Sequence, residues 1–236
     1  MKEYLVGMAV CSALCIGNLS AAPILVGPVA SCLSFGSAGS NVDDVTVPYS
    51  VFSAPNFACE QQDKIFSNFN VGLIPTSSAL RFQLQTIGPL DFHTLTLNGN
   101  FGSAFAYSYD IAIDQDFGGP GANALERIVR VSGDISNPVF QGNPSNLKRV
   151  STSAAPGTVI GSLTSTIPNP GTPIALSEVA LHVADAYTPG GGAVVSISNT
   201  FLQVGTPNSV PEPLTYTLFG GGFLLLASIR RFRRSS

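Results

Sequence analysis

The chain of 236 residues holds 24 glycines and 17 prolines, but only 11 Lys or Arg, 14 Asp or Glu and no tryptophan, for a net charge of −3. Because Lys and Glu are scarce, the composition argues against long amphipathic helices. Residues 23–213 carry 13 acidic and six basic side chains, a net charge of −7. An acidic domain without a basic patch argues against a nucleic-acid partner and suits a soluble exported protein.

The N-terminal segment has the organisation of a secretory signal peptide. Lys2 precedes an apolar stretch from Tyr4 to Ile16, and the small residues Ser20-Ala21-Ala22 follow. The Sec translocon and signal peptidase recognise this order of a basic region, an apolar segment and a small-residue cleavage site. We therefore expect residues 1–21 to be removed, with an uncleaved membrane helix as the alternative.

Two cysteines, Cys32 and Cys59, remain after this cleavage. Export makes a disulfide between them the expected state, with two free buried thiols as the alternative. Zinc is not expected because the chain has no Cys-x-x-Cys pair, and His93 and His182 lie far apart in the sequence. No cofactor is assigned.

Residues 22–204 are predicted to form one domain of short strands and turns. Alternation of apolar and polar residues predicts half-buried strands over 80–87, 92–97 and 101–113. Gly88-Pro89 and Asn98-Gly99-Asn100 mark turns between them, so these three strands are expected to form a meander.

Further strands are predicted on both sides of this meander. They cover residues 65–71, 128–131, 174–186 and 193–204, and the last two are expected to form a hairpin at Gly190-Gly191-Gly192. Residues 136–172 are predicted to be long loops around one or two short strands. About eight or nine strands without a helical repeat favour an all-β fold, an antiparallel β-sandwich that is jelly-roll-like.

Asp63, Lys64 and His93 are expected at the surface of the domain. Asp63 and Lys64 are interpreted as solvated turn residues before the strand 65–71, and His93 as a surface residue because it alternates with Phe92.

Three aspartates, Asp110, Asp114 and Asp116, precede the glycine-rich loop 118–121 and are weak candidates for Ca²⁺ ligands. Gly118 stands where an EF-hand loop has a ligand, and no acidic residue closes the site at the expected distance. A solvated turn is therefore preferred, and no metal is assigned.

The chain is expected not to be an enzyme. It has no Gly-x-Ser-x-Gly elbow, no His-Glu-x-x-His and no phosphate-binding glycine loop between a strand and a helix. The alternative is a secreted polysaccharide hydrolase on a jelly-roll scaffold. Its paired carboxylates, Asp110 with Glu126 or Glu178 with Asp185, would have to converge in the fold.

The last 27 residues have three parts. The first part, Val210, Pro211, Glu212 and Pro213, follows a polar linker over 205–209. An uncharged apolar run covers 214–229, and Arg230, Arg231, Arg233 and Arg234 come directly after it. At about 1.5 Å per helical residue the run reaches roughly 24 Å, and it spans a bilayer if the arginine stems snorkel. Arginines directly after a span stay on the cytoplasmic side. We therefore expect one C-terminal transmembrane helix in contact with lipid, with the domain outside.

The order of Pro-Glu-Pro, apolar span and arginine cluster resembles the PEP-CTERM sorting tail of exported bacterial proteins, also called the ice-binding protein C-terminal domain. The stretch from Cys59 to Phe69, with Asp63-Lys64, an aromatic residue and Asn68-Phe69, is similar to one found in many proteins with this tail. A simple membrane anchor is the alternative.

The resemblance implies recognition and processing at residues 210–213 by exosortase, a membrane-embedded cysteine transpeptidase or protease. It also implies an inner-membrane intermediate and then a place at the cell surface or outside the cell. Since the family is associated with exopolysaccharide, the expected role is structural or carbohydrate-binding, in the extracellular matrix.

Overall fold

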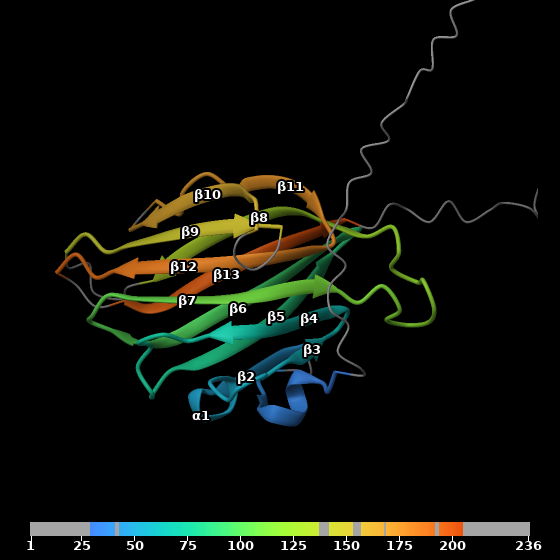
Figure 1. Ribbon diagram of the computed structural model, residues 1–236, viewed down its shortest axis with the longest axis horizontal. Helices are drawn as coiled ribbons and strands as arrows, with labels where there is room; N and C mark the ends of the chain where they lie inside the picture. The colour runs from blue at the N-terminus through green and yellow to red at the C-terminus, as the bar shows by residue number, and fades with distance from the viewer. Residues whose placement is uncertain are drawn as a thin grey trace, which may run out of the picture.

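The structure, a computed structural model, describes residues 29–40, 43–136, 142–152, 157–167, 169–191 and 194–204. These residues form thirteen strands in two antiparallel sheets that pack as a β-sandwich (Figure 1). The all-β sandwich prediction is confirmed, although the strands are more numerous than expected. The predicted signal helix and C-terminal span lie outside the described residues, and within the described ranges no helix has the length and hydrophobicity needed to cross a bilayer.

The larger sheet has seven strands in the order β1-β2-β5-β6-β13-β8-β11. Their bounds are β1 (Ser37–Ala38), β2 (Asp44–Pro48), β5 (Ala79–Ile87), β6 (Leu90–Phe101), β8 (Arg127–Ser136), β11 (Ile174–Glu178) and β13 (Val194–Val204). β13 lies between β6 and β8 and pairs with both over most of its length. The longest ladders of the sheet therefore surround its last strand.

The smaller sheet has six strands in the order β10-β9-β12-β7-β4-β3. Their bounds are β3 (Cys59–Gln61), β4 (Lys64–Asn70), β7 (Phe105–Ile113), β9 (Ser145–Ser151), β10 (Val159–Thr166) and β12 (Ala180–Thr188). β12 lies between β7 and β9 in unbroken register, so its outward side chains stand in rows with those of both neighbours.

Two short helices lie near the beginning of the described chain: a 3-10 helix over Cys32–Phe35 and α1 over Tyr49–Phe52. The disulfide between Cys32 and Cys59 joins the 3-10 helix to β3 across a sequence separation of 27 residues, and both cysteines are fully buried. The structure therefore contains the cysteine pair proposed from the sequence.

The core lies between the sheets and is formed by alternate residues of each strand. In β7, Tyr107, Tyr109 and Ile111 are buried, whereas Ala106 and Ser108 face outward. Rings from both sheets contact one another there, as in the edge-to-face pair of Tyr109 with Phe201 of β13. Large aromatic side chains contribute much of the buried apolar area that stabilises such a core.

A fully buried polar network also crosses the core. Lys148 Nζ of β9 lies 2.5 Å from Asp185 Oδ1 of β12, and Asn146 donates to the same oxygen at 2.6 Å. Asn199 of β13 donates to Asp185 Oδ2 at 3.2 Å and to the Tyr107 hydroxyl at 2.9 Å. A charge desolvated this completely costs several kcal/mol unless it is paired. The mutual hydrogen bonds offset that cost.

The predicted connections between strands are only partly right. β5 and β6 form the expected hairpin, but β7 lies in the other sheet, so the predicted meander is wrong. The residues 98–100, predicted as a turn, continue β6. β12 and β13 lie in different sheets, so the predicted last hairpin is also wrong. Apolar and polar residues alternate in the same way in a strand that crosses to the other sheet and in one that folds back beside its neighbour. The local pattern therefore does not show which of the two connections is formed.

The alternation of the strand 65–71 predicts that Ile65, Ser67, Phe69 and Val71 share one face, and this prediction is wrong. Phe66 is buried and Ile65 faces outward. A β-bulge at Asn68, whose φ is 54°, then shifts the register, so that Phe69 and Val71 pack against the core. A bulge adds one residue to a strand and exchanges its two faces, which explains the difference.

Candidate functional site

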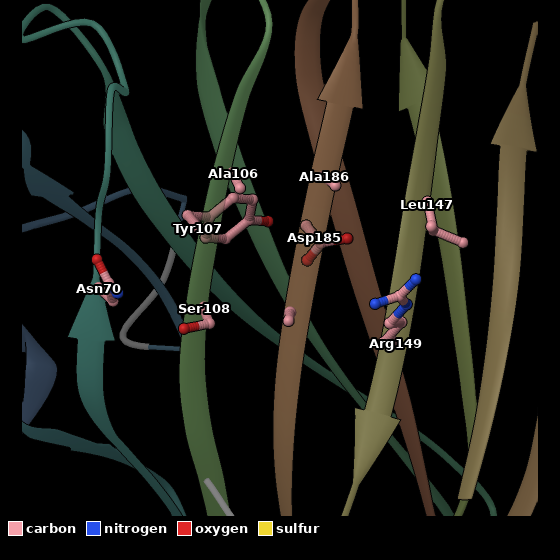
Figure 2. Close-up of a pocket in the computed structure, with 9 residues that line it drawn as sticks. Asn70, Ala106, Tyr107, Ser108, Leu147, Arg149, Asp185 and Ala186 are labelled. Carbon is pink, nitrogen blue, oxygen red and sulfur yellow. The ribbon is translucent and has the colours of Figure 1, made fainter. Parts of the chain in front are cut away.

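A shallow groove of about 280 Å³ lies on the outer face of the smaller sheet (Figure 2). Small side chains of two adjacent strands form its floor: Ala106 and Ser108 of β7, with Ala184 and Ala186 of β12. Leu147 and Arg149 of β9 border it on one side and Asn70 of β4 on the other. We call these seven residues the sheet-face groove. Its depth arises because the central strands carry small side chains and the flanking strands carry larger ones.

The register of the sheet places polar side chains beside this groove in rows. Ala184 lies opposite Ser108 on one side and Arg149 on the other. In the next outward row, His182 lies opposite Asp110, and its Nδ1 is 2.6 Å from Asp110 Oδ1. Asn68, turned by the β-bulge, donates to the other oxygen of Asp110 at 2.6 Å. The bulge therefore fixes a polar cluster at the margin of the groove.

The groove has the chemistry of a binding surface for a polar chain. Arg149 and Asn70 are exposed and offer hydrogen-bond donors, and Asn70 and Ser108 offer acceptors as well. The methyl groups of the alanines give flat apolar contact between them. This combination of apolar contact and a few directional polar groups is typical of ligand sites in general.

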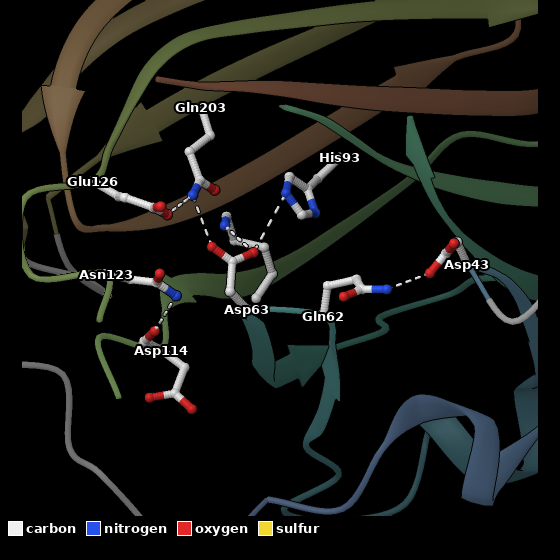
Figure 3. A network of polar contacts seen from close by, with 9 residues as sticks. Asp43, Gln62, Asp63, His93, Asp114, Asn123, Glu126 and Gln203 are labelled. Carbon is white, nitrogen blue, oxygen red and sulfur yellow. Dashed lines mark hydrogen bonds and ion pairs between the residues drawn. The ribbon is translucent and has the colours of Figure 1, made fainter. Parts of the chain in front are cut away.

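A second depression, of about 230 Å³, lies at one end of the sandwich, where β5 ends and β4 and β6 begin, and Figure 3 shows the polar contacts among the residues there. Its lining comes from the turn before β4, from β5, from β6 and from the loop 114–126: Gln62, Asp63, Leu84, Thr86, Asp91, His93, Phe117, Asn123 and Glu126. We call it the end pocket. It brings together acidic groups that lie far apart in the sequence.

The Asp63 carboxylate is the centre of the polar contacts in the end pocket. Its Oδ1 lies 2.6 Å from Lys64 Nζ and 3.5 Å from His93 Nε2. Gln203 of β13 donates to its Oδ2 at 2.7 Å and also to Glu126. Asp63 and Glu126 therefore share one amide group, so the two carboxyl groups are close together.

Burial shifts the protonation of the groups in and beside this pocket. Burial, together with a hydrogen bond with Asp63, raises the pKa of Glu126 to about 7. Burial also raises the pKa of Glu60 to about 7, with Asp114 adding to the effect. It lowers the pKa of His93 to about 3, helped by the charge of Lys64. At neutral pH, His93 is uncharged and Glu126 exchanges its proton readily, as a general acid or base does.

The structure corrects three assignments made from the sequence. Asp63, Lys64 and His93, predicted to be solvated or on the surface, are only 8%, 0% and 2% exposed. His93 shares its face of β6 with Leu95, and that face is the core. The alternation with Phe92 was predicted correctly, but the wrong face was assigned to the interior.

The carboxylate pairs considered for hydrolysis do not converge. Asp110 bonds to His182 on the outer face, whereas Glu126 lies in the end pocket. Asp185 is part of the buried network, and Glu178 lies at the end of β11 in the other sheet. Glu126 instead forms a hydrogen bond with Asp63, which was predicted to be a solvated turn residue, and Asp91 lines the same pocket.

The three aspartates considered for Ca²⁺ are separated by the fold. Asp110 belongs to the cluster beside the sheet-face groove. Asp114 and Asp116 stabilise the loop that follows β7, since they accept backbone hydrogen bonds from Asp116 and Gly121 at 3.0 and 2.7 Å. In the described ranges, no group of three or more His, Cys, Asp or Glu side chains is arranged to hold a metal ion.

The residues that form the sheet-face groove were not predicted from the sequence. One signal was present: small residues alternate with inward aromatic or charged ones, as in Ala106-Tyr107-Ser108 and Ala184-Asp185-Ala186. The bordering Arg149 and Asn70 had no local signal, because only strand pairing brings them to the same face. The sorting motif 210–213 and the arginine cluster 230–234 lie outside the described residues.

No protein-family model, curated protein or solved structure matches this chain.

Proposed function

We propose that the protein is exported through its N-terminal signal peptide, held in the inner membrane by the segment 214–229 and processed at Pro211-Glu212-Pro213 by exosortase. The two ends of the sequence support this proposal. The disulfide between Cys32 and Cys59 supports it independently, because it hints at an oxidising compartment, such as the exterior of the cell.

We further propose that the sandwich is a jelly roll with added edge strands. In a jelly roll, eight strands wind through two sheets of four by Greek-key connections. The orders β6-β13-β8-β11 and β7-β12-β9-β10 follow that scheme strand by strand. The remaining strands, β1 to β5, extend the same two sheets at the β6 and β7 edges.

The proposed activity of the domain is carbohydrate binding at the cell surface, with an exopolysaccharide as the ligand. The sheet-face groove carries this proposal, because its floor of small side chains leaves room for a sugar chain between Arg149 and Asn70. A polysaccharide presents hydroxyl groups to such donors and acceptors, and its ring faces contact the alanine methyl groups.

A glycan array with the protein spanning residues 23–209 tests this proposal. We expect Arg149→Ala to weaken binding about tenfold or more, because a hydrogen bond to a charged group contributes about 1.5–3 kcal/mol. Arg130→Ala is the matched control, since Arg130 is exposed on the larger sheet and its loss leaves the groove intact. Absence of binding by the wild type, or equal loss in both variants, would contradict the proposal.

A second candidate function is polysaccharide hydrolysis in the end pocket. The observation that favours it is the contact between Glu126 and Asp63, with the Glu126 pKa raised to about 7. A carboxyl group poised near neutral pH beside a second carboxyl group is suited to general acid catalysis. A reducing-sugar assay distinguishes the two functions: binding without turnover supports the groove alone, whereas turnover that Glu126→Gln abolishes supports hydrolysis.

A further inference from the structure

The buried network around Lys148 contains more polar groups than an ion pair needs, because two asparagines join Lys148 and Asp185. Lys148 and Asn199 are 0% exposed, and Asp185 and Asn146 are 1% exposed. Lysine is seldom buried so completely. The network nevertheless places an amine, a carboxylate and two carboxamides in the buried core, where each of them is costly to desolvate.

One carboxylate bridges the amine to a carboxamide of the opposite sheet. Asp185 Oδ1 accepts from Lys148 Nζ at 2.5 Å, and Asp185 Oδ2 accepts from Asn199 Nδ2 at 3.2 Å. Lys148 belongs to β9 of the smaller sheet and Asn199 to β13 of the larger one. Lys148 Nζ and Asn199 Nδ2 therefore bind the two oxygens of the Asp185 carboxylate. This carboxylate can carry a proton from one nitrogen to the other.

The carbonyl oxygens of Asn199 and Asn146 are both buried and have no hydrogen bond, so strand position and the oxygen of Asp185 that each amide binds must distinguish the two side chains. Asn199 lies on the opposite sheet from Lys148, and its Nδ2 donates to Asp185 Oδ2 and to the Tyr107 hydroxyl. Asn146 is a poorer match, because it lies on the same strand as Lys148 and binds the same oxygen as the amine. The geometry therefore distinguishes one of the two carboxamides.

A glycine directs the lysine side chain toward the opposite sheet. Gly133 of β8 lies against Lys148, and a Cβ atom at this position would be 2.6 Å from Lys148 Cε. The aliphatic stem of Lys148 thus passes over bare backbone of the larger sheet. Burial also lowers the pKa of Lys148, which favours the uncharged amine, the form that acts as a nucleophile.

We propose that Lys148 and Asn199 form an intramolecular isopeptide bond that covalently joins the two sheets. Lys148 Nζ attacks Cγ of Asn199, and a new C–N bond forms while the bond from Cγ to Nδ2 breaks. Asp185 takes a proton from the amine and passes it to Nδ2, which leaves as ammonia. The reaction exchanges one amide for another, so it needs no oxidant, reductant or further reactant.

The mass of the purified protein tests this proposal directly. Release of one ammonia lowers the intact mass by about 17 Da relative to the mature chain. In a tryptic digest of the denatured protein, Lys148 would resist cleavage, and the peptide ending at Arg149 would stay joined to the one that begins at Val150 and contains Asn199. An unmodified mass, with free Lys148 in the digest, would overturn the proposal.

Variants distinguish Asn199 from the other groups in the network. We expect the mass of Asn199→Ala to equal the mass calculated from its sequence. Asn146→Ala should be about 17 Da lighter than calculated, because it still loses ammonia. Asp185→Asn keeps the shape of the proton carrier but not its basicity, and should abolish the loss. The assignment would be overturned by a bond in the wild type that joins Lys148 to Asn146, Asn199 to Lys64, or Lys148 to Asp185 with loss of water. This result does not depend on whether any variant folds.

Discussion

Glu126 and His93 line the same pocket, and burial moves their pKa values in opposite directions. The pKa of Glu126 rises from 4.5 to about 7, so between these values the folded protein holds a proton that the unfolded chain has released. Stability therefore falls as pH rises through this window and stays reduced above pH 7. The pKa of His93 falls from 6.5 to about 3, so its contribution to stability is lost as pH drops through that window.

The variant Glu126→Gln isolates the first of these effects. Because glutamine does not ionise, we expect the stability of this variant relative to wild type to be more favourable at pH 8 than at pH 4. Thermal unfolding at both pH values, followed by circular dichroism, measures the difference. His93→Gln is the control, for which we expect the opposite dependence on pH. Its stability relative to wild type should be more favourable at pH 4 than at pH 8, because the wild type loses stability when His93 of the unfolded chain is protonated. A difference between Glu126→Gln and wild type that does not change with pH would contradict the assignment.

At this scale the sequence predicted some side-chain orientations and missed others. The alternation over 101–113 puts the large apolar side chains on one face of the strand, and that face of β7 is buried: Phe105, Tyr107, Tyr109, Ile111 and Ile113. In β6, Phe92 on one face competes with Leu95 on the other, so the pattern did not identify the core face and His93 was misplaced. The burial of Lys148 depends on Asp185, 37 residues later, and no local pattern encodes that pair.

At the scale of the element, close contact between β8 and β9 depends on Gly133. A Cβ atom there would lie 2.6 Å from Lys148 Cε, and a shift of the fully buried lysine side chain would disturb its hydrogen bond to Asp185. We expect Gly133→Ala to destabilise the fold by about 1–3 kcal/mol, as overpacking does. Urea unfolding measures this loss. Gly102→Ala is the control, since nothing lies within 4 Å of its Cβ position; equal effects of the two would contradict this account.

The disulfide secures the 3-10 helix and the edge strand β3 to each other. It closes a loop with a sequence separation of 27 residues. We expect replacement of Cys32 and Cys59 by serine to lower the free energy of unfolding by about 3–4 kcal/mol, chiefly by freeing the unfolded chain. Unfolding by urea, with and without reductant, checks the prediction. Reductant should weaken the wild type and leave the double variant unchanged; equal sensitivity of both would point to another cause.

Strands were easier to predict than their partners. The alternation over 80–87 identified β5, and the glycine and proline turn after it identified its hairpin with β6. The division of 174–186 into β11 and β12, in different sheets, has no counterpart in the local pattern. Which sheet receives each strand depends on pairings between distant segments, such as β13 with β6, and a window of ten residues does not contain them.

At the scale of the whole molecule, the processing proposal predicts a specific defect. We expect Glu212→Gln, or replacement of Pro211 and Pro213 by alanine, to leave a full-length form in the membrane fraction, because exosortase would no longer recognise the tail. Mass spectrometry of protein recovered from cells and medium measures both ends of the chain. Trimming of these variants at the wild-type position would contradict the involvement of exosortase.

The burial of Lys64 and Lys148 affects how the domain reacts with its surroundings. Once residues 1–21 are removed these are the chain's two lysines, and neither exposes any surface. Amine-reactive dyes and bifunctional esters should therefore label the folded domain at its new N-terminus alone. A covalent bond from the surface of the folded domain to another molecule must therefore use a hydroxyl group, a carboxylate or an end of the chain. It cannot use a lysine side chain, because both are buried.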